Sequence, residues 1–534
     1  MKIFYTIWCA LALCGCSTEC LRVLQSASYR PRRGYFKVVF SCYFGVLAVL
    51  CAFSWFWKVC FPAESVLCLI YTLVALILHF IPRKCPLKFT RRVWRIIAVE
   101  FVILLCACWF AMHWWVLFLP LFVFVAWLLC LPIEALINKK YLTAAHRKLV
   151  SSGVAVIAIT GSFGKTSTKN MLCSLLDGAI SPSGSCNTPL GIAKYINSTS
   201  FDNVKYLVLE FGARQKGDIA QLCRLFPPTH GVITGVCAQH LSTFKTEENV
   251  FAAKMELAEC LPPQGFCVLC DESVQFADVG CCKKVVSPQV KVYDMQVSPK
   301  GLSFCVVERE NKKNKVETEK TEEIAGTEAT QKIKEVDAAN KIKKTEKSAA
   351  IEETDTAYCV RLPQITPYSA QTFAFCATLC LLLQQPLATT VQNAARIEQV
   401  AHRMQISFNG KFYIIDDSYN ANIRGVASCC EVVTKFCGTK VVISQGIAEG
   451  GRLQKSLNMQ CGKMLGEVFD VVIALGKNKK QLLAGASSAN KMVPTSPTVL
   501  QAKNLQHAVE LAQAYLNVGD FLVFQNDLPD VANI

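Results

Sequence analysis

Long apolar runs occupy the first quarter of the chain, whereas shorter apolar segments alternate with polar ones through the rest. The five runs are residues 3–16, 38–57, 65–81, 96–112 and 114–133. The last four approach the roughly 17–25 residues that a helix needs to cross a bilayer. The first run is shorter and also resembles a signal peptide. The pattern therefore predicts a membrane region of about five transmembrane helices within residues 1–140.

The distribution of charge supports this interpretation. Residues 1–150 hold 17 Lys and Arg against 4 Asp and Glu, which is 13 of the net 16 positive charges of the chain. These basic residues cluster in alternate loops, and such loops face the cytoplasm. We expect a multi-pass protein in contact with membrane lipid, with its N-terminus outside and everything after Ile133 in the cytoplasm. The excess charge forms no basic patch elsewhere, so no nucleic-acid partner is expected.

The 29 cysteines are scattered, and many lie inside apolar runs as small hydrophobic residues. The adjacent pairs at 281–282 and 429–430 are poorly suited to ordinary disulfides, and no CxxC pair repeats at zinc spacing. Reduced thiols in a reducing compartment fit this usage best.

From Val154 onward, short buried-strand runs alternate with helical stretches, which is typical of a mostly parallel α/β sheet. One set of strands is expected at residues 154–160, 206–212, 231–236 and 265–270, and a second near 412, 440–444, 470–475 and 521–524. We therefore expect a central domain over residues 141–397 and a C-terminal domain over 398–534. Residues 308–357 are rich in Lys, Glu, Thr and Ala and lack large apolar residues, so this tract is expected to be a disordered or loosely helical insertion.

The strongest local motif follows the first of these strands and opens a helix. Glycines there allow a tight turn whose amide groups, with the helix N-terminus, face phosphate oxygens. The lysine reaches the outer phosphates, and the threonine hydroxyl can bind Mg²⁺. The spacing is shorter than in the usual Walker loop, which would have glycine in place of Ile159. The motif consists of Gly161, Ser162, Phe163, Gly164, Lys165, Thr166 and Ser167.

The segment TGSFGKTSTK resembles the phosphate loop of the Mur ligase family, in particular its MurF branch. Further blocks appear in family order: CNTPLGIA, LEFGARQKGDI, HGVITGVCAQHLSTF, AAKMEL, AHRMQI, IIDDSYNAN and FQNDLPD. The resemblance implies a P-loop central domain, a Rossmann-like C-terminal domain and a bacterial cytoplasmic membrane location. It also implies an ATP-dependent ligase of peptidoglycan synthesis that adds D-alanyl-D-alanine to a muramoyl-tripeptide through an acyl phosphate.

The same resemblance implies roles for individual residues. Thr166 and Glu210 would hold one Mg²⁺, and His240 and Lys254 a second; the matching family lysine is carbamylated, which gives the metal an anionic oxygen. Three alternatives stay open. Glu210 could be a helix-cap partner and His240 a loop histidine. Arg403, which the resemblance places at the γ-phosphate, could form a surface ion pair. The residues expected at the nucleotide from the C-terminal domain are Arg403, Asp417 and Asn422, while Asn187 contacts adenine or shapes a turn.

Two departures limit the transfer. Residues 362–371 read LPQITPYSAQ where the family has a Gly-x-His-Asn motif, and a membrane bundle replaces the small uridine-nucleotide-binding domain. The muramoyl-tripeptide acceptor could therefore be UDP-linked or lipid-linked, and other cell-wall enzymes are possible partners. The alternatives are a ligase for another amino-acid donor and a degenerate nucleotide-binding membrane scaffold.

Overall fold

The computed structural model of this chain divides into two compact units, Met1–Thr143 and Ala144–Ile534, which are described separately. It describes residues 2–26, 29, 87–109, 118–235, 247–269, 285–286, 288–308, 357–419, 423–447, 453–489 and 496–525. Of the sequence expectations above, the apolar runs at 38–57 and 65–81, His240, Asn422 and almost all of the charged insertion lie outside these residues.

The first unit is helical in the part that is described. It contains α1 (Lys2–Ser26), α4 (Arg91–Trp109) and the beginning of α5 (Leu119–Ser152). Helix α1 extends beyond the apolar run at residues 3–16. The additional turns contain Glu19 and Arg22, whose i,i+3 ion pair stabilises the helix there. The segment Thr6–Gln25 and helix α5 are long and apolar enough to cross a membrane. Glu134 of α5 is buried and binds Arg95 of α4.

A six-stranded parallel sheet forms the first part of the second unit, in the order β2-β3-β1-β4-β5-β6. Strand β1 lies inside the sheet, between β3 and β4, and the strand order changes direction at this point. The carboxyl ends of such strands form a crevice where the order changes direction, and ligands bind there in open α/β sheets. The strands are β1 (Ala155–Thr160), β2 (Ala179–Ile180), β3 (Tyr206–Glu210), β4 (His230–Ile233), β5 (Cys267–Leu269) and β6 (Val285–Val286).

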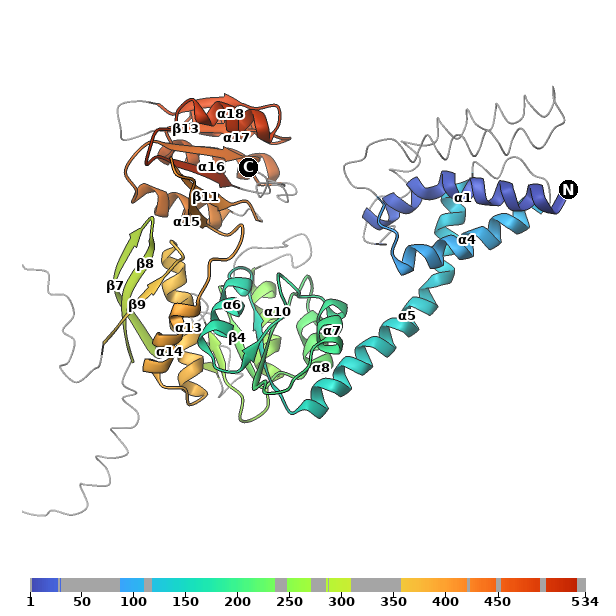
Figure 1. Ribbon diagram of the computed structural model, residues 1–534, viewed down its shortest axis with the longest axis horizontal. Coiled ribbons are helices and arrows are strands. Elements are labelled where there is room, and N and C mark those ends of the chain that lie inside the picture. The colour runs from blue at the N-terminus through green and yellow to red at the C-terminus, as the bar shows by residue number, and fades with distance from the viewer. Residues whose placement is uncertain are drawn as a thin grey trace, which may run out of the picture. The chain divides into compact units, whose positions relative to one another are not determined.

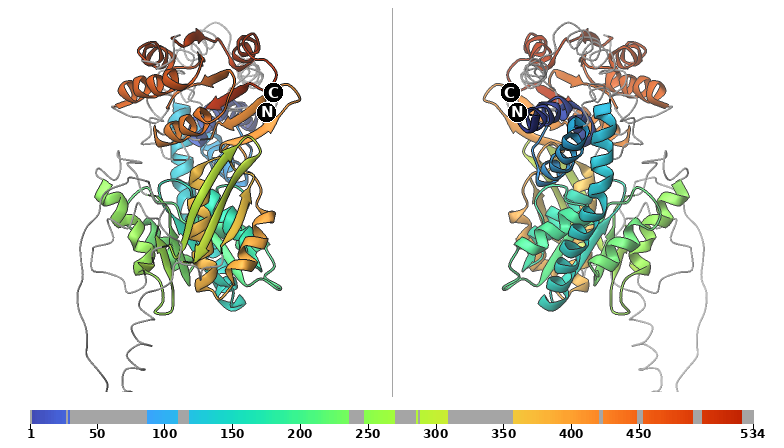
Figure 2. Two further views of the ribbon diagram at one scale, coloured as in Figure 1. Left: turned by 90° about the vertical axis from the view of Figure 1, so that its left-hand side faces the viewer. Right: turned by 90° about the vertical axis from the view of Figure 1, so that its right-hand side faces the viewer.

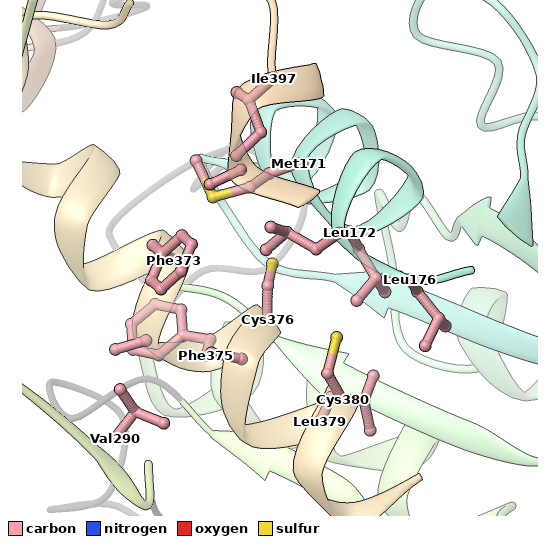
Figure 3. Close-up of a cluster of buried hydrophobic side chains, with 14 of the residues drawn as sticks. Met171, Leu172, Leu176, Val290, Phe373, Phe375, Cys376, Leu379, Cys380 and Ile397 are labelled. Carbon is pink, nitrogen blue, oxygen red and sulfur yellow. The ribbon is translucent and has the colours of Figure 1, made fainter. Parts of the chain in front are cut away.

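Helices lie around this sheet (Figure 1), and the main core packs between two of them. Met171, Leu172 and Leu176, from α6 and the residue after it, face Phe373 and Cys376 of α13 (Figure 3). This packing fixes α6, the helix that opens the phosphate loop, against the body of the domain. The helices here are α6 (Lys165–Leu175), α7 (Pro189–Ser198), α8 (Asp218–Leu225), α10 (Glu247–Glu259), α13 (Pro367–Leu382) and α14 (Leu387–Asn393), followed by the short 3₁₀ helix η3 (Ala394–Arg396).

A three-stranded antiparallel sheet covers the other side of α13 and was not predicted from the sequence. It consists of β7 (Val290–Ser298), β8 (Gly301–Glu308) and β9 (Tyr358–Leu362). One face packs on the core, where Phe304 meets Phe373 edge to face. The charged insertion is therefore placed between the end of β8 and the beginning of β9.

The C-terminal sheet has the order β10-β11-β15-β12-β13-β14, and all neighbours are parallel except β10 and β11. Its central strands are the apolar runs that the sequence indicated. The strands are β10 (Gln405–Phe408), β11 (Tyr413–Asp417), β12 (Lys440–Ser444), β13 (Val471–Ala474), β14 (Thr498–Gln501) and β15 (Phe521–Gln525), with helices α15 (Ile423–Thr434), α16 (Gln454–Val468), α17 (Lys479–Ser487) and α18 (Leu505–Gln513). The α/β class is confirmed in both sheets; the domain boundary at residues 397/398 stays a prediction.

Candidate active site

The phosphate loop follows β1 directly and ends in the first turn of α6. Gly164, at the N-cap of α6, has a left-handed backbone with φ +78° and, as glycine, has no side chain that could cap the helix. The first amides of α6 are therefore free of a side-chain cap, which leaves them available to an anion. Gly161 also has a positive φ of +150°, and a Cβ there would come within 1.9 Å of Thr234 Oγ1.

The segment after β4 holds the loop from the other side. The Ser162 amide donates to the Gly235 carbonyl over 2.9 Å, and the Thr234 hydroxyl donates to the Phe163 carbonyl over 2.6 Å. Lys165 curls back, so that its ammonium donates to the carbonyls of Gly161 (2.7 Å) and Ser162 (3.3 Å). To reach a phosphate, Lys165 would exchange these two loop carbonyls for phosphate oxygens.

Thr166 and Glu210 meet as the sequence led us to expect. The Thr166 hydroxyl donates to Glu210 Oε2 over 3.2 Å, and both side chains are almost fully buried. The other oxygen, Oε1, lies 3.4 Å from Lys169 Nζ and accepts no hydrogen bond from any residue that the structure describes. Lys169 also donates to the Pro182 and Gly184 carbonyls. Glu210 is therefore not a helix-cap partner, and it retains a buried oxygen that can accept a further ligand.

The C-terminal domain contributes an arginine to the same point. Arg403 Nη2 donates to Thr166 Oγ1 over 3.3 Å, so Arg403, Thr166 and Glu210 form one continuous chain of hydrogen bonds. Ser185 lies beside them: its Oγ is 3.2 Å from Thr166 Oγ1 and accepts from the Tyr419 hydroxyl at 3.3 Å. The interpretation of Arg403 as a surface ion pair is therefore not supported.

The loop that carries Arg403 has an unusual backbone. His402 and Met404, on either side of it, both have positive φ, at +61° and +49°. Such conformations are costly for non-glycine residues and persist where surrounding contacts enforce them. Asp416 Oδ2 is 2.8 Å from His402 Nδ1, and the Tyr419 amide donates to the His402 carbonyl.

The guanidinium of Arg403 lies 4.6 Å from the centre of the Tyr419 ring, which is a cation–π contact. This ring therefore supports the Arg403 side chain, while the Tyr419 amide holds the neighbouring backbone at the His402 carbonyl. Sequence reasoning missed the contributions of Lys169, Ser185, His402 and Tyr419. Three of them belong to quoted blocks, Lys169 to TGSFGKTSTK, His402 to AHRMQI and Tyr419 to IIDDSYNAN, whereas Ser185 lies in none.

Asp417 lies at the end of β11, next to this loop. Its pKa is raised from 3.8 to about 7, chiefly by burial and in small part by Asp416, against the lowering effect of the Met404 amide and the Arg403 guanidinium. Asn187 is half-buried and lies against Gly212, just after β3, where a Cβ would be 3.3 Å from Asn187 Cγ. The residue after it, Thr188, caps α7 through the Gly191 amide. Both interpretations of Asn187 stay open.

The raised pKa of Asp417 predicts a pH-dependent stability. Because its pKa is higher in the folded than in the unfolded chain, the stabilising contribution is present below about pH 4 and is lost as pH rises through about 7. Asp417→Asn removes this dependence. In calorimetric melts between pH 4.5 and 8, we expect the Tm of the variant to gain on that of the native chain as pH rises. Parallel Tm curves for the two proteins would contradict the assignment.

Lys254 lies on α10 and is buried. Two residues further on, Glu256 accepts from the Gly217 and Ala220 amides at the start of α8, which joins the two helices. No contact between Lys254 and Glu210 is seen within the described part of the chain. His240, the other residue expected at a second metal site, lies outside it, so that site stays a prediction.

The aromatic ring of Phe163 occupies the middle of the phosphate loop. It packs on Tyr368, the second residue of α13, with ring centroids 5.4 Å apart. A Cβ on Gly164 would come within 2.7 Å of the Tyr368 hydroxyl. Tyr368 belongs to LPQITPYSAQ, the segment that departs from the family motif, so this chain places an aromatic residue against its phosphate loop there.

Comparison with known proteins finds relatives for part of this chain. Residues 159–325 match the model of the Mur ligase middle domain. The UDP-N-acetylmuramoyl-tripeptide--D-alanyl-D-alanine ligase of Mycobacterium tuberculosis (strain ATCC 25618 / H37Rv) is 38% identical over 133 residues, which are 24% of this chain and 26% of that protein. The same-named protein of Escherichia coli (strain K12) is 21% identical over 66% of this chain and 71% of its own. The chain thus spans about a quarter of the length of the first of these relatives.

Solved structures agree with the fold. MurF from Acinetobacter baumannii superposes with a TM-score of 0.59 at 19% identity, covering 74% of this chain and 79% of that one. MurF ligase from Thermotoga maritima, in complex with ADP, gives a TM-score of 0.56 at 20% identity, covering 73% and 80%. Residues 159–325 therefore resemble the Mur ligase middle domain, and the fold of the chain is that of MurF enzymes, which are also among its relatives.

Proposed function

We propose that this chain is an ATP-dependent ligase that joins D-alanyl-D-alanine to the terminal carboxylate of a muramoyl-tripeptide. The names of its relatives support this substrate pair. The observation that carries the proposal is the hydrogen-bonded chain from Arg403 through Thr166 to Glu210, because it joins the C-terminal domain to the phosphate loop. A ligase needs this convergence, since ATP and the acceptor carboxylate must meet in one place.

In this proposal, ATP is a substrate whose phosphates lie over the loop at 161–167. The loop amides and the start of α6 receive phosphate oxygens, and Lys165 turns from its own loop carbonyls toward them. Arg403 meets the γ-phosphate from the opposite side. The carboxylate of the acceptor takes up the γ-phosphoryl group, and the amine of D-alanyl-D-alanine then displaces phosphate from the acyl carbon.

The residues at the loop fit one magnesium ion. Thr166 and Glu210 offer hard oxygen donors, and Glu210 Oε1 is buried without a hydrogen-bond donor from the described residues. When bound, Mg²⁺ would neutralise negative charge on the phosphate oxygens. The Lys169 ammonium lies 3.4 Å from this same Oε1 atom and forms an ion pair with the Glu210 carboxylate.

For the second magnesium site, we propose that Lys254 is carbamylated. Replacing Lys254 with alanine is expected to abolish turnover, because the anionic oxygen is lost, and added short carboxylates should restore part of it. Phosphate release with and without formate or acetate measures this. Lys216→Ala, at an exposed lysine of the same domain, is the matched control. A fully active Lys254→Ala enzyme would contradict the carbamate.

We also propose that the chain is held in the bacterial cytoplasmic membrane as a multi-pass protein, with its ligase domains in the cytoplasm. In the described part of the first unit, large apolar side chains are exposed on α1 and α5, including Phe4, Leu11, Leu128, Leu129 and Leu136. Many exposed large apolar side chains on long apolar helices are typical of membrane contact. We expect alkaline carbonate to leave the chain in the membrane pellet and detergent to release it. Release by carbonate alone would contradict the proposal.

One assay tests the function and identifies the acceptor. The detergent-solubilised chain is incubated with ATP, Mg²⁺, D-alanyl-D-alanine and either the UDP-linked or the lipid-linked tripeptide. We expect phosphate release and a pentapeptide product that depend on both the dipeptide and one acceptor. Phosphate release with another amino-acid donor would redirect the substrate assignment. ATP binding without turnover under every combination would instead favour a scaffold.

A further inference from the structure

Two cysteines face each other on the outer side of the three-stranded sheet. Cys305 of β8 and Cys359 of β9 are directly opposite in the antiparallel register. Their Sγ atoms are 3.2 Å apart, and both thiols are free. Cys305 is partly exposed and Cys359 is exposed, so small reagents in solution can reach them.

The alternation of side chains along the strands explains why this pair faces solvent. Phe304 and Val306 on β8 and Val360 on β9 are buried in the core beneath the sheet. The residues between them point the other way, since successive side chains alternate across a sheet. The left panel of Figure 2 views the sheet formed by β7, β8 and β9. The pair therefore lies outside the core, on the face of the sheet opposite Phe304, Val306 and Val360.

The backbone already meets the requirements of a disulfide. Directly opposed residues in an antiparallel pair have Cα atoms about 4.5–5.5 Å apart. This range lies inside the roughly 4.4–6.8 Å that disulfides span, and the S–S bond itself is about 2.05 Å long. Closing the remaining gap of about 1 Å takes rotation of two side chains and no movement of the strands.

The two thiols are not equivalent. The hydrogen bond to Cys359 and, next, burial raise the pKa of Cys305 to about 11, so this thiol keeps its proton near neutral pH. Cys359 is also the more exposed of the two. Cys359 is thus the residue that reacts first with an incoming disulfide, and Cys305 follows.

We propose that Cys305 and Cys359 form a reversible thiol–disulfide site for small disulfides of the glutathione type. The Cys359 thiolate attacks one sulfur of the small disulfide, forms a mixed disulfide and releases one small thiolate. Cys305 then gives its proton to solvent, attacks the Cys359 sulfur and releases the second thiolate. Two protein thiols are oxidised to one disulfide, and one small disulfide is reduced to two thiols.

The disulfide would have a defined structural effect. The two cysteines are 54 positions apart, and the Lys- and Glu-rich residues 309–356 lie between them in sequence. A bond here would join β8 to β9 covalently and close this insertion into a loop. In a reducing compartment both cysteines stay as thiols, as they are in the structure, and an oxidising change closes the loop.

Peptide mapping tests the proposal on the full-length chain, independently of ligase activity. The detergent-solubilised protein is exposed to oxidised glutathione, blocked with an alkylating agent and digested with trypsin without reduction. Each cysteine is the only one in its tryptic peptide, GLSFCVVER (301–309) and SAAIEETDTAYCVR (348–361). We expect one linked peptide pair, 2 Da lighter than the sum of the two peptides, that dithiothreitol separates.

Single variants establish the order of the steps. In Cys305→Ser no thiol can attack the mixed disulfide on Cys359. The glutathione adduct on Cys359 is therefore expected to be at least about 10-fold more abundant than in the native chain, where Cys305 displaces the glutathione. Cys437, an exposed cysteine, is the internal control for a thiol without such a partner. Two results, each without a linked peptide, would overturn the proposal. One is a stable glutathione adduct on Cys305 or Cys359 of the native chain, and the other is no reaction at either cysteine.

Discussion

Replacing Arg403 with alanine is expected to lower kcat by about 10²–10³-fold, while the affinity for ATP in the absence of acceptor changes much less. The reason is that Arg403 reaches the phosphate loop from the other domain, at 3.3 Å from the Thr166 hydroxyl. A charge donor aimed at a transferring phosphoryl group stabilises the transition state more than the ground state. Steady-state phosphate release and calorimetric binding of a non-hydrolysable ATP analogue measure the two quantities.

Arg403→Lys is expected to recover only part of this loss. Lysine keeps the charge but lacks the planar group that packs on the Tyr419 ring. Arg396→Ala is the matched control, because Arg396 forms an exposed pair with Asp177, and such pairs contribute about 1 kcal/mol or less. Loss of activity in Arg396→Ala equal to that in Arg403→Ala would mean that domain packing, and not phosphate contact, explains the effect.

Glu210→Gln is expected to cost at least about 10³-fold in turnover and to weaken Mg²⁺ uptake with the ATP analogue. The substitution keeps the shape of the side chain and removes its charge, which a hard divalent cation needs. It also leaves the buried Lys169 ammonium with only the Pro182 and Gly184 carbonyls. Breaking a buried pair from one side typically destabilises a protein by about 3–5 kcal/mol, so the Tm should fall as well.

A double variant separates the two effects. Lys169→Met combined with Glu210→Gln removes both charges, so the Tm should recover while Mg²⁺ uptake does not. Glu256→Gln is the control for a buried carboxylate elsewhere: it weakens the cap of α8 but should leave Mg²⁺ uptake unchanged. If the double variant recovered both stability and Mg²⁺ uptake, Glu210 would serve only to neutralise Lys169.

The strands that could be predicted from the sequence are those buried on both faces. Residues 155–159 and 441–443 are uninterrupted apolar runs because helices or neighbouring elements cover both sides of a parallel sheet. The sheet of β7, β8 and β9 was missed because only one of its faces is buried and a long charged insertion separates β8 from β9. The two-residue strands β2 and β6 carry too little pattern to be recognised.

The candidate site divides in the same way. The phosphate loop could be predicted from its residues, because a strand, glycines, Lys165 and Thr166 are contiguous. Glu210 and Arg403 came from the resemblance to a family, and their meeting at Thr166 is visible only in the folded chain. Lys169 ends the TGSFGKTSTK block, but its pairing with Glu210 is visible only in the folded chain. Ser185 lies outside the quoted blocks, and its contact with Thr166 has no sequence signal.

The central claim is that the γ-phosphoryl group of ATP passes onto the carboxylate of the acceptor. An acceptor tripeptide labelled with ¹⁸O in its terminal carboxylate tests this directly, by mass spectrometry of the phosphate that the full-length chain releases in the presence of D-alanyl-D-alanine. Transfer through an acyl phosphate predicts one ¹⁸O atom in each phosphate formed. Release of unlabelled phosphate would contradict the claim, whether or not the peptide product forms at the same time.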